Sequence, residues 1–168
     1  MKTRALFVAG GLALTLTLAA CGNDDETQAA ENISASMMEN SDDDEFSVDQ
    51  DQADCVGEGM VDRIGVDQLQ EYGMLNDDLE VEGTVTDVRM EEGDADEAAD
   101  VLVSCTDAQA MLTEQFADDD SFGEQERECI NEVLDDEALT QLFSMMFQGR
   151  EDEAMNELVE PLLACMMG

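Results

Sequence analysis

The sequence predicts an all-α fold, a small disulfide-stabilised helical bundle built from two repeated helical units. Three observations support this fold class. Apolar residues recur at i, i+3, i+4 and i+7 over much of the second half of the chain, which is the spacing of one helix face. Residues that cap helices precede several of these segments. Four cysteines occur as two successive pairs, and in each pair the first cysteine lies at the start of a predicted helix and the second at the end of a later one.

The expected helices of the first half follow from spacing and caps. Residues 54–64 form the first, and Asp67 is expected to cap a short second helix that Gly73 ends. Apolar residues at helical spacing predict a third over residues 98–105. Two capping boxes then open further helices: Thr106 with Gln109, and Ser121 with Glu124. Residues 79–90 contain Val81, Val85 and Val88 among threonine and glycine, and we expect a short β-hairpin insertion there.

The last two helices carry the clearest apolar stripes. Gln148-Gly149 marks the turn between them, so we expect the two helices to be antiparallel neighbours. Pro161 removes a backbone donor within the final stripe and predicts a kink or a restart of that helix. We expect an apolar binding groove between the two helices, lined by Leu139, Phe143, Met146, Phe147, Leu158 and Leu162.

An internal duplication relates residues 53–105 to residues 127–168. In each unit a cysteine begins the first helix and another cysteine ends the last helix. This symmetry favours the disulfides Cys55–Cys105 and Cys129–Cys165 over the two other pairings that four cysteines allow. Pairing of Cys105 with Cys129, or bridges that cross between the units, remain the alternatives.

The first twenty residues have the order of a secretory signal peptide. A basic start with Lys2 and Arg4 precedes an apolar run over residues 5–18, which is shorter than a membrane-spanning helix needs. The tetrapeptide Leu18-Ala19-Ala20-Cys21 resembles the lipobox of bacterial lipoproteins. This resemblance implies cleavage before Cys21, diacylglycerol on its sulfur, and attachment to the extracellular face of the cell membrane. Cysteine counting agrees, because lipid on Cys21 leaves an even number for disulfides.

Residues 21–52 are polar and acidic, with few apolar side chains to bury. We therefore expect a disordered acidic tether between the lipid and a helical domain over residues 53–168. A flexible chain of this length spans about 30 Å on average.

The charge of the chain excludes some partners. Formal net charge is −38, and it becomes about −40 when Lys2 and Arg4 leave with the signal peptide. Such a chain is repelled by phosphate backbones, so we expect no nucleic-acid binding. Self-repulsion at this charge is relieved by salt, and a solvated acidic surface of this kind is similar to the surfaces of proteins from salt-loving organisms.

Catalytic residues are scarce. The chain has no histidine, and after loss of the signal peptide it has no lysine, which excludes histidine-dependent triads, lysine imines and histidine-ligated zinc. A small carboxylate-based hydrolase is the remaining enzymatic alternative, but no pair of acids stands out. We expect a non-enzymatic protein without a cofactor.

Calcium binding is the stronger alternative, because the ion takes six to eight oxygen ligands. The segment Asp118-Asp119-Asp120 begins a loop that resembles an EF-hand, with glycine at its sixth position. Phe122 at the fifth position and Cys129 at the twelfth exclude a true EF-hand. These three aspartates are therefore candidates for a looser cation site.

The helical domain also resembles acidic helical lipoproteins and secreted proteins of actinobacteria. The shared features are a first cysteine, Val-Asp, Gly-Val-Asp-x-Leu and a later cysteine, here Cys55, Val61-Asp62, Gly65-Val66-Asp67-Gln68-Leu69 and Cys105. The resemblance carries over no active site. We therefore expect a lipid-anchored, non-catalytic binding module of the cell envelope, with the lipid bilayer and an envelope protein or small ligand as partners.

Overall fold

The structure is a computed structural model that describes residues 24–41, 48–82, 88–117 and 123–167. Within these ranges the chain is helical, and one antiparallel β-bridge, Leu75 with Val81, is its sole β-type pairing. The predicted all-α fold is confirmed. The helices are α1 (Asp24–Ser41), α2 (Gln50–Arg63), α3 (Val66–Glu71), α4 (Glu92–Cys105), α5 (Ala108–Ala117), α6 (Glu124–Val133), α7 (Asp136–Phe147) and α8 (Glu151–Met167).

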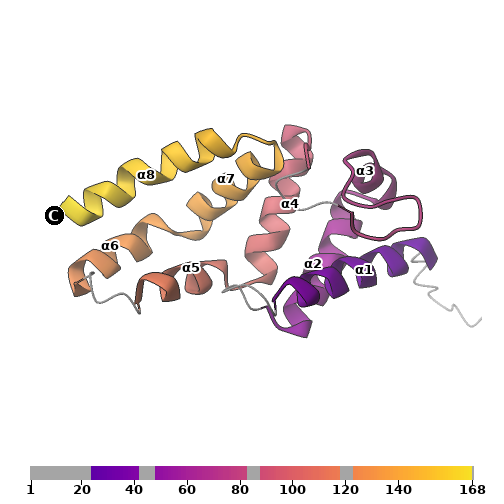
Figure 1. Cartoon of the computed structure of the whole chain (residues 1–168), viewed down its shortest axis with the longest axis horizontal. Helices are drawn as coiled ribbons and strands as arrows, with labels where there is room; N and C mark the ends of the chain where they lie inside the picture. Colours follow the sequence, from indigo (N-terminus) through magenta and orange to yellow (C-terminus); the bar gives the residue numbers. More distant parts are fainter. Residues whose placement is uncertain (1–23, 42–47, 83–87, 118–122, 168) are drawn as a thin grey trace, which may run out of the picture.

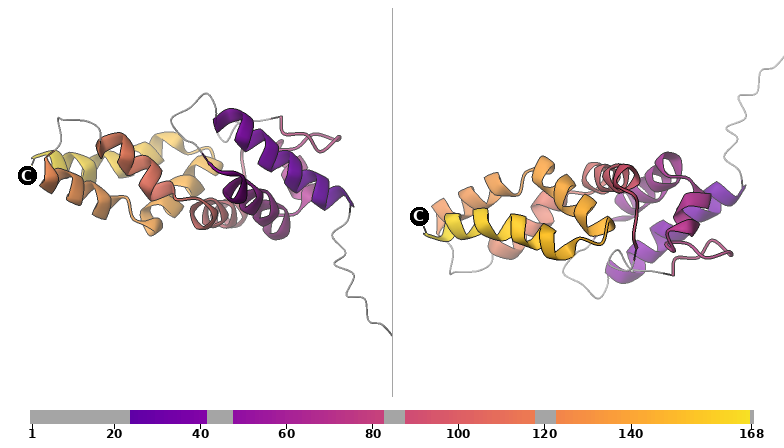
Figure 2. Two further views of the ribbon diagram at one scale, coloured as in Figure 1. Left: turned by 90° about the horizontal axis from the view of Figure 1, so that it is seen from below. Right: turned by 90° about the horizontal axis from the view of Figure 1, so that it is seen from above.

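The helices form an elongated bundle. Helices α1 to α3 gather at one end of the long axis and α6 to α8 at the other, with α4 between them (Figure 1). Two further views show that the start of α1 and the end of α8 lie at opposite ends of the molecule (Figure 2). None of the helices in the described ranges combines the length and the apolar character that a membrane crossing requires.

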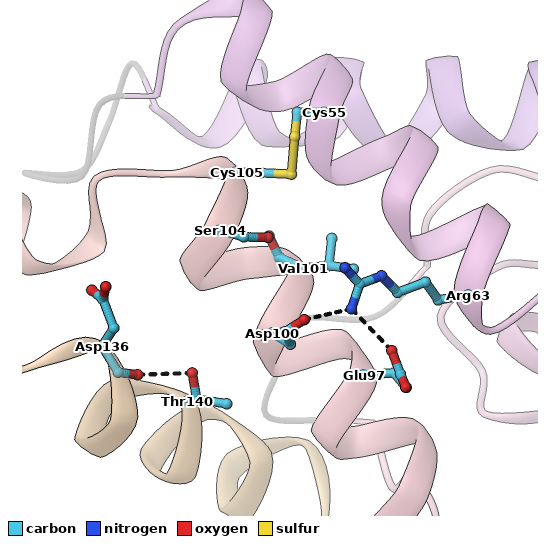
Figure 3. Close-up of polar contacts among 9 residues, drawn as sticks. All are labelled: Cys55, Arg63, Glu97, Asp100, Val101, Ser104, Cys105, Asp136 and Thr140. Atoms are coloured by element: carbon cyan, nitrogen blue, oxygen red, sulfur yellow. Dashed lines mark hydrogen bonds and ion pairs between the residues drawn. A yellow bond between two sulfur atoms is a disulfide. The ribbon is translucent and has the colours of Figure 1, made fainter.

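Helices α2 and α4 are held together covalently and by close packing. A disulfide joins Cys55 of α2 to Cys105 at the end of α4, and Arg63 of α2 donates to Asp100 and Glu97 of α4 (Figure 3). The Arg63 pairs are exposed and therefore contribute little. The disulfide closes a segment with a sequence separation of 50 and stabilises the fold by about 4 kcal/mol in the chain-entropy model.

Helix α1 corrects the predicted tether. Residues 24–41 form a helix that packs on α2, so the expectation of disorder over residues 21–52 is wrong for this segment. Ala29 and Ile33 are buried in the core beside α2, and Met37 packs against the same core. These residues are four apart and lie on one face, while the acids occupy the solvent side, which is why the average composition suggested disorder.

The second unit repeats the covalent pattern of the first. The disulfide Cys129–Cys165 joins α6 to the end of α8, so both predicted pairings are confirmed. A second core lies among α5, α6, α7 and α8, and its buried members are Ala108, Ile130, Leu134, Leu139 and Cys165. In both units, therefore, the closing helix is tied to the opening helix.

Helix α4 joins the two units because it packs on both α2 and α7. Ala95, Ala98 and Ala99 of α4 are fully buried, and their small side chains allow close approach of the neighbouring helices. Phe147, at the end of α7, is buried in the core of the first unit, and its carbonyl accepts from the backbone N–H of Met90 at 2.8 Å. The two units therefore share a continuous interface.

Two helix ends differ from the expected caps. Asp67 lies in the first turn of α3, and the residue before that helix is Gly65. Thr106 ends α4, where its hydroxyl donates to the carbonyl of Leu102 at 2.7 Å. The carboxylate of Asp107 instead accepts a backbone N–H at the start of α5. Neighbouring residues can serve as caps, and sequence alone does not select among them.

Two other expectations fall partly outside the described residues. The first is the capping box of Ser121 with Glu124, because Ser121 lies outside the described ranges. Within them, the start of α6 is capped by Glu126, whose carboxylate accepts from the N–H of Gly123. Of the expected hairpin over 79–90, residues 83–87 lie outside the described ranges, and the remainder contains no strand.

We predict that Gly57→Ala destabilises the fold. A Cβ at position 57 would lie 2.3 Å from the backbone oxygen of Ala30, so α1 and α2 would have to separate, and we expect a loss of about 1–3 kcal/mol. Urea unfolding with intact disulfides measures the loss. The control is Gly93→Ala, in the first turn of α4, which meets no neighbour and should gain about 0.5–1 kcal/mol. Equal effects of the two substitutions would contradict the close contact of α1 with α2.

We also predict that Tyr72 ionises above the ordinary tyrosine pKa. Its hydroxyl donates to Asp94 at 2.6 Å, and this bond, together with partial burial, raises the pKa of Tyr72. The stability that the bond contributes is present below the ordinary pKa of about 10 and is lost as pH rises through the folded value.

Absorbance titration reports Tyr72 specifically, because the chain has one tyrosine and no tryptophan. Asp94→Ala should return the pKa toward its ordinary value. Glu97→Ala removes the same charge from α4 but its carboxylate pairs with Arg63, so it should leave the pKa of Tyr72 nearly unchanged. A shift of similar size in both variants would mean that net charge, and not the hydrogen bond, sets this pKa.

Candidate functional site

The turn between α7 and α8 fixes the position of the last helix. Asp135 caps α7 by accepting the N–H of Ala138 at 2.8 Å. Gly149 has a φ of +72°, a left-handed conformation that favours glycine, and the Arg89 side chain occupies the space that a Cβ at this position would need. The N–H of Arg150 donates to the carbonyl of Met145 at 2.8 Å and closes the turn. The C-terminal helix is therefore held antiparallel to α7.

Most of the residues predicted for the apolar groove lie elsewhere. Leu139 and Phe147 are completely or almost completely buried, in the second and the first core respectively, so their assignment to a groove is wrong. Phe143, Met146 and Leu162 are half-buried, and none of them lines the hollow among α6, α7 and α8. Leu158 lines a hollow of about 100 Å³ among α6, α7 and α8.

The apolar surface of this region lies instead on the outer side of α8. Met155, Val159, Leu163 and Met166 are exposed by 57%, 43%, 46% and 52%, and we call these four residues the α8 face. Their spacing of four, four and three places them on one side of the helix. Leu158, Leu162 and Cys165 lie on the adjacent side and pack into the second core. The structure thus assigns the two sides of α8 opposite environments.

The α8 face was missed although the signal was present in the sequence. The apolar residues of α8 cover two adjacent sides of the helix. An apolar stripe this wide exceeds the surface that a single pair of neighbouring helices can bury, so it indicates that one side stays uncovered. The spacing alone does not say which of the two sides it is, and the sequence interpretation placed the binding residues on the side that faces the core.

The helix that carries the α8 face is acidic from Glu151 to Glu160. Helix α8 contains no lysine or arginine, and its acids are Glu151, Asp152, Glu153, Glu157 and Glu160. Arg150, just before the helix, pairs with Glu153. Glu157 accepts from Gln141 of α7 at 2.7 Å, which leaves Glu160 exposed in the middle of the helix. Any molecule that covers the α8 face therefore meets negative charge at its edges.

Two larger hollows are lined mainly by polar and acidic groups. One, of about 520 Å³, lies between α1 and α2 and includes Asp54. Buried Ser34 donates to Asp54, as does Gln50, and these hydrogen bonds lower the pKa of Asp54. The other, of about 480 Å³, lies among α4, α7 and α8 and includes Asp96, which accepts from buried Ser144. Both buried serine hydroxyls are thus satisfied by carboxylates.

Metal coordination finds no support in the part of the chain that the structure describes. No three or more cysteine, aspartate or glutamate side chains come together there as a group that could hold a metal ion. Asp118, Asp119 and Asp120 lie outside the described residues, as does Cys21.

We predict that substitution in the second core lowers the free energy of unfolding far more than substitution on the α8 face. Leu139→Ala should cost about 2–5 kcal/mol, because it removes buried methyl groups from the second core. Leu163→Gln should change the free energy of unfolding by less than about 0.5 kcal/mol, because Leu163 is exposed. Circular dichroism during urea unfolding measures both. A loss for Leu163→Gln as large as that for Leu139→Ala would place the α8 face in the core and exclude it as a surface.

Comparisons with known proteins add no family to this description. No protein-family model matches the chain, and neither a curated protein nor a solved structure matches it. The function proposed below therefore rests on the residues and surfaces of this chain.

Proposed function

We propose that this protein is a lipid-anchored extracellular module that binds a partner and does not catalyse a reaction. The observation that carries the proposal is the α8 face, a continuous exposed apolar surface on an otherwise strongly acidic protein. Exposed apolar residues gathered on one helix face are typical of interaction sites, whereas single exposed apolar residues are ordinary. The partner is a protein of the cell envelope.

The lipid anchor is supported by the cysteine pairing. Cys55, Cys105, Cys129 and Cys165 are all used in disulfides, so no cysteine of this chain is left to pair with Cys21. Disulfides are typical of proteins outside the cytoplasm. Lipid on Cys21, as the lipobox resemblance implies, accounts for the fifth cysteine and for the oxidised state of the other four.

In this proposal the lipid anchor lies close to the folded protein. Cys21 precedes the start of α1 at Asp24 by three residues, which span at most about 10 Å. The end of α8 lies at the opposite end of the bundle (Figures 1 and 2). In this proposal the helical bundle takes over the role of the expected tether, and it holds the α8 face away from the lipid surface.

A protein partner is favoured over a small apolar ligand by cavity size. The apolar hollow beside Leu158 measures about 100 Å³, whereas pockets for small ligands usually measure about 300–1,000 Å³. The larger hollows present carboxylates. Asp54, in one of them, has a lowered pKa, and a general acid requires a raised one. This hollow therefore gives no support to a carboxylate-based hydrolase.

We predict the intact mass of the protein extracted from the membranes of its native host. The mass should equal that of the chain beginning at Cys21 plus at least two acyl chains, since one chain anchors a protein only marginally. Reduction should add four hydrogens, two for each disulfide. A Cys21→Ser variant is the control and should carry no lipid. A native mass without lipid, or a chain that starts elsewhere, would refute the anchor.

A further inference from the structure

The two units can be compared residue by residue because each ends in a disulfide cysteine. Cys105 closes α4 and Cys165 closes α8, and each is bonded to the first helix of its own unit. When the helices are aligned on these cysteines, Ala95 of α4 corresponds to Met155 of α8. By the same alignment, Ala99 corresponds to Val159 and Val103 to Leu163.

In α4, this side of the helix is covered by another helix. Ala95 and Ala99 are fully buried, and α4 packs against α7. Asp96, on the same side, accepts from Ser144 of α7, and Val103 packs against the second core with residues of α7. The side of α4 that corresponds to the α8 face is therefore the side that receives α7.

In α8 the corresponding side has no covering helix within the described residues. Met155 and Val159 are exposed where Ala95 and Ala99 are buried. The side chains are also larger, and methionine adapts to irregular contacts because it is unbranched and flexible. A helix that lay on α8 as α7 lies on α4 would cover Met155, Val159 and Leu163 together. The internal comparison thus indicates that an α-helix is the shape that fits the α8 face.

The charges around the α8 face indicate what kind of helix would bind there. Helix α8 carries five acids and no basic residue, and α6, which packs beside it, adds exposed Glu128 and Glu132 and one cation, Arg127. A second copy of this chain would bring the same acids to the contact, and like charges at an interface oppose association. A partner helix with lysine or arginine beside its apolar stripe would instead bring positive charge to Glu160 and its neighbours.

We propose that the α8 face binds an amphipathic α-helix of a partner protein, with lysine or arginine residues flanking the apolar stripe of that helix. This inference rests on the proposed function and names the class of partner. The apolar stripe covers Met155, Val159, Leu163 and Met166, and the basic flanks lie against the acids of α8. Recognition of an amphipathic helix takes its affinity from apolar anchors and its selectivity from the charged edges.

The test uses the purified full chain in nonionic detergent and three fluorescent peptides about as long as α8. The basic probe carries a leucine stripe flanked by lysine. The acidic probe has glutamate in place of each lysine. The dispersed probe has the composition of the basic probe, but its leucines are scattered around the helix. Fluorescence anisotropy at several salt concentrations measures binding.

We expect the basic probe to bind, and both other probes to bind at least about tenfold more weakly. The double variant Val159→Gln/Leu163→Gln should weaken the basic probe at least about tenfold, since it removes two apolar anchors. Circular dichroism checks that the variant remains folded. Raising the salt concentration should weaken the basic probe as the charged edges are screened.

A matched pair of variants separates the edge of the α8 face from net charge. Glu160→Gln and Asp67→Asn each remove one negative charge, the first on α8 and the second in α3. Glu160→Gln should weaken the basic probe several-fold, and Asp67→Asn should leave its affinity unchanged. Equal weakening by both variants would overturn the proposal, as would equal binding of the dispersed probe, because either result would mean that general acidity attracts the peptide.

Three more results would overturn the proposal. The first is tight binding of the acidic probe, and the second is a dimer of the chain that Val159→Gln/Leu163→Gln disrupts. The third is the absence of binding by any probe. In that case a photo-crosslinker at position 159, used in native membranes, distinguishes a wrong class of partner from a wrong binding function. Capture of a protein there would leave the binding function standing with another class of partner, whereas no capture would remove both.

Discussion

The packing of α4 between α2 and α7 is the contact on which the rest of the molecule depends. Three alanines allow both neighbours to approach closely, and the disulfide at Cys105 fixes one of them covalently. Because Phe147 of α7 enters the first core, the second unit is oriented by the first. The direction of α7 then sets the turn at Gly149 and the exposure of α8. Bulkier residues on α4 would separate both neighbours at once.

Three arginines lie at or near contacts between helices. Arg63 links α2 to α4, Arg89 lies beside the turn at Gly149 and pairs with Glu151, and Arg150 pairs with Glu153 at the start of α8. Each pair is exposed and individually weak. In a chain of this net charge, however, they reduce repulsion at the contacts between elements, where acids would otherwise face one another.

The sequence was sufficient for features that depend on periodicity or symmetry, and insufficient for those that depend on a particular neighbour. The disulfide pairing followed from the repeated order of the cysteines, and the last two helices followed from their stripes. Helix α1 was missed because its few buried residues, such as Ala29 and Ile33, are diluted by acids on the solvent side. Thr106 and Asp107 are adjacent cap formers, and the fold decides which helix each one serves.

The binding residues were misplaced for a related reason. A helix with two apolar sides does not reveal which side its own chain will cover, because that depends on where α6 and α7 lie. Leu158 and Leu162 were chosen, and both are half-buried against the second core, while Met155 and Val159 are exposed. The comparison of α4 with α8 resolves this ambiguity in three dimensions, where the spacing of residues could not.

The two disulfides also determine how the molecule responds to a pulling force. Tension between the start of α1 and the end of α8 acts along the long axis of the bundle. The bonds bypass segments with sequence separations of 50 and 36, and each residue in them could otherwise span up to about 3.3–3.6 Å when the chain is extended. Mechanical load is therefore carried through sulfur–sulfur bonds across both units, and most of the chain cannot be extended while they remain oxidised.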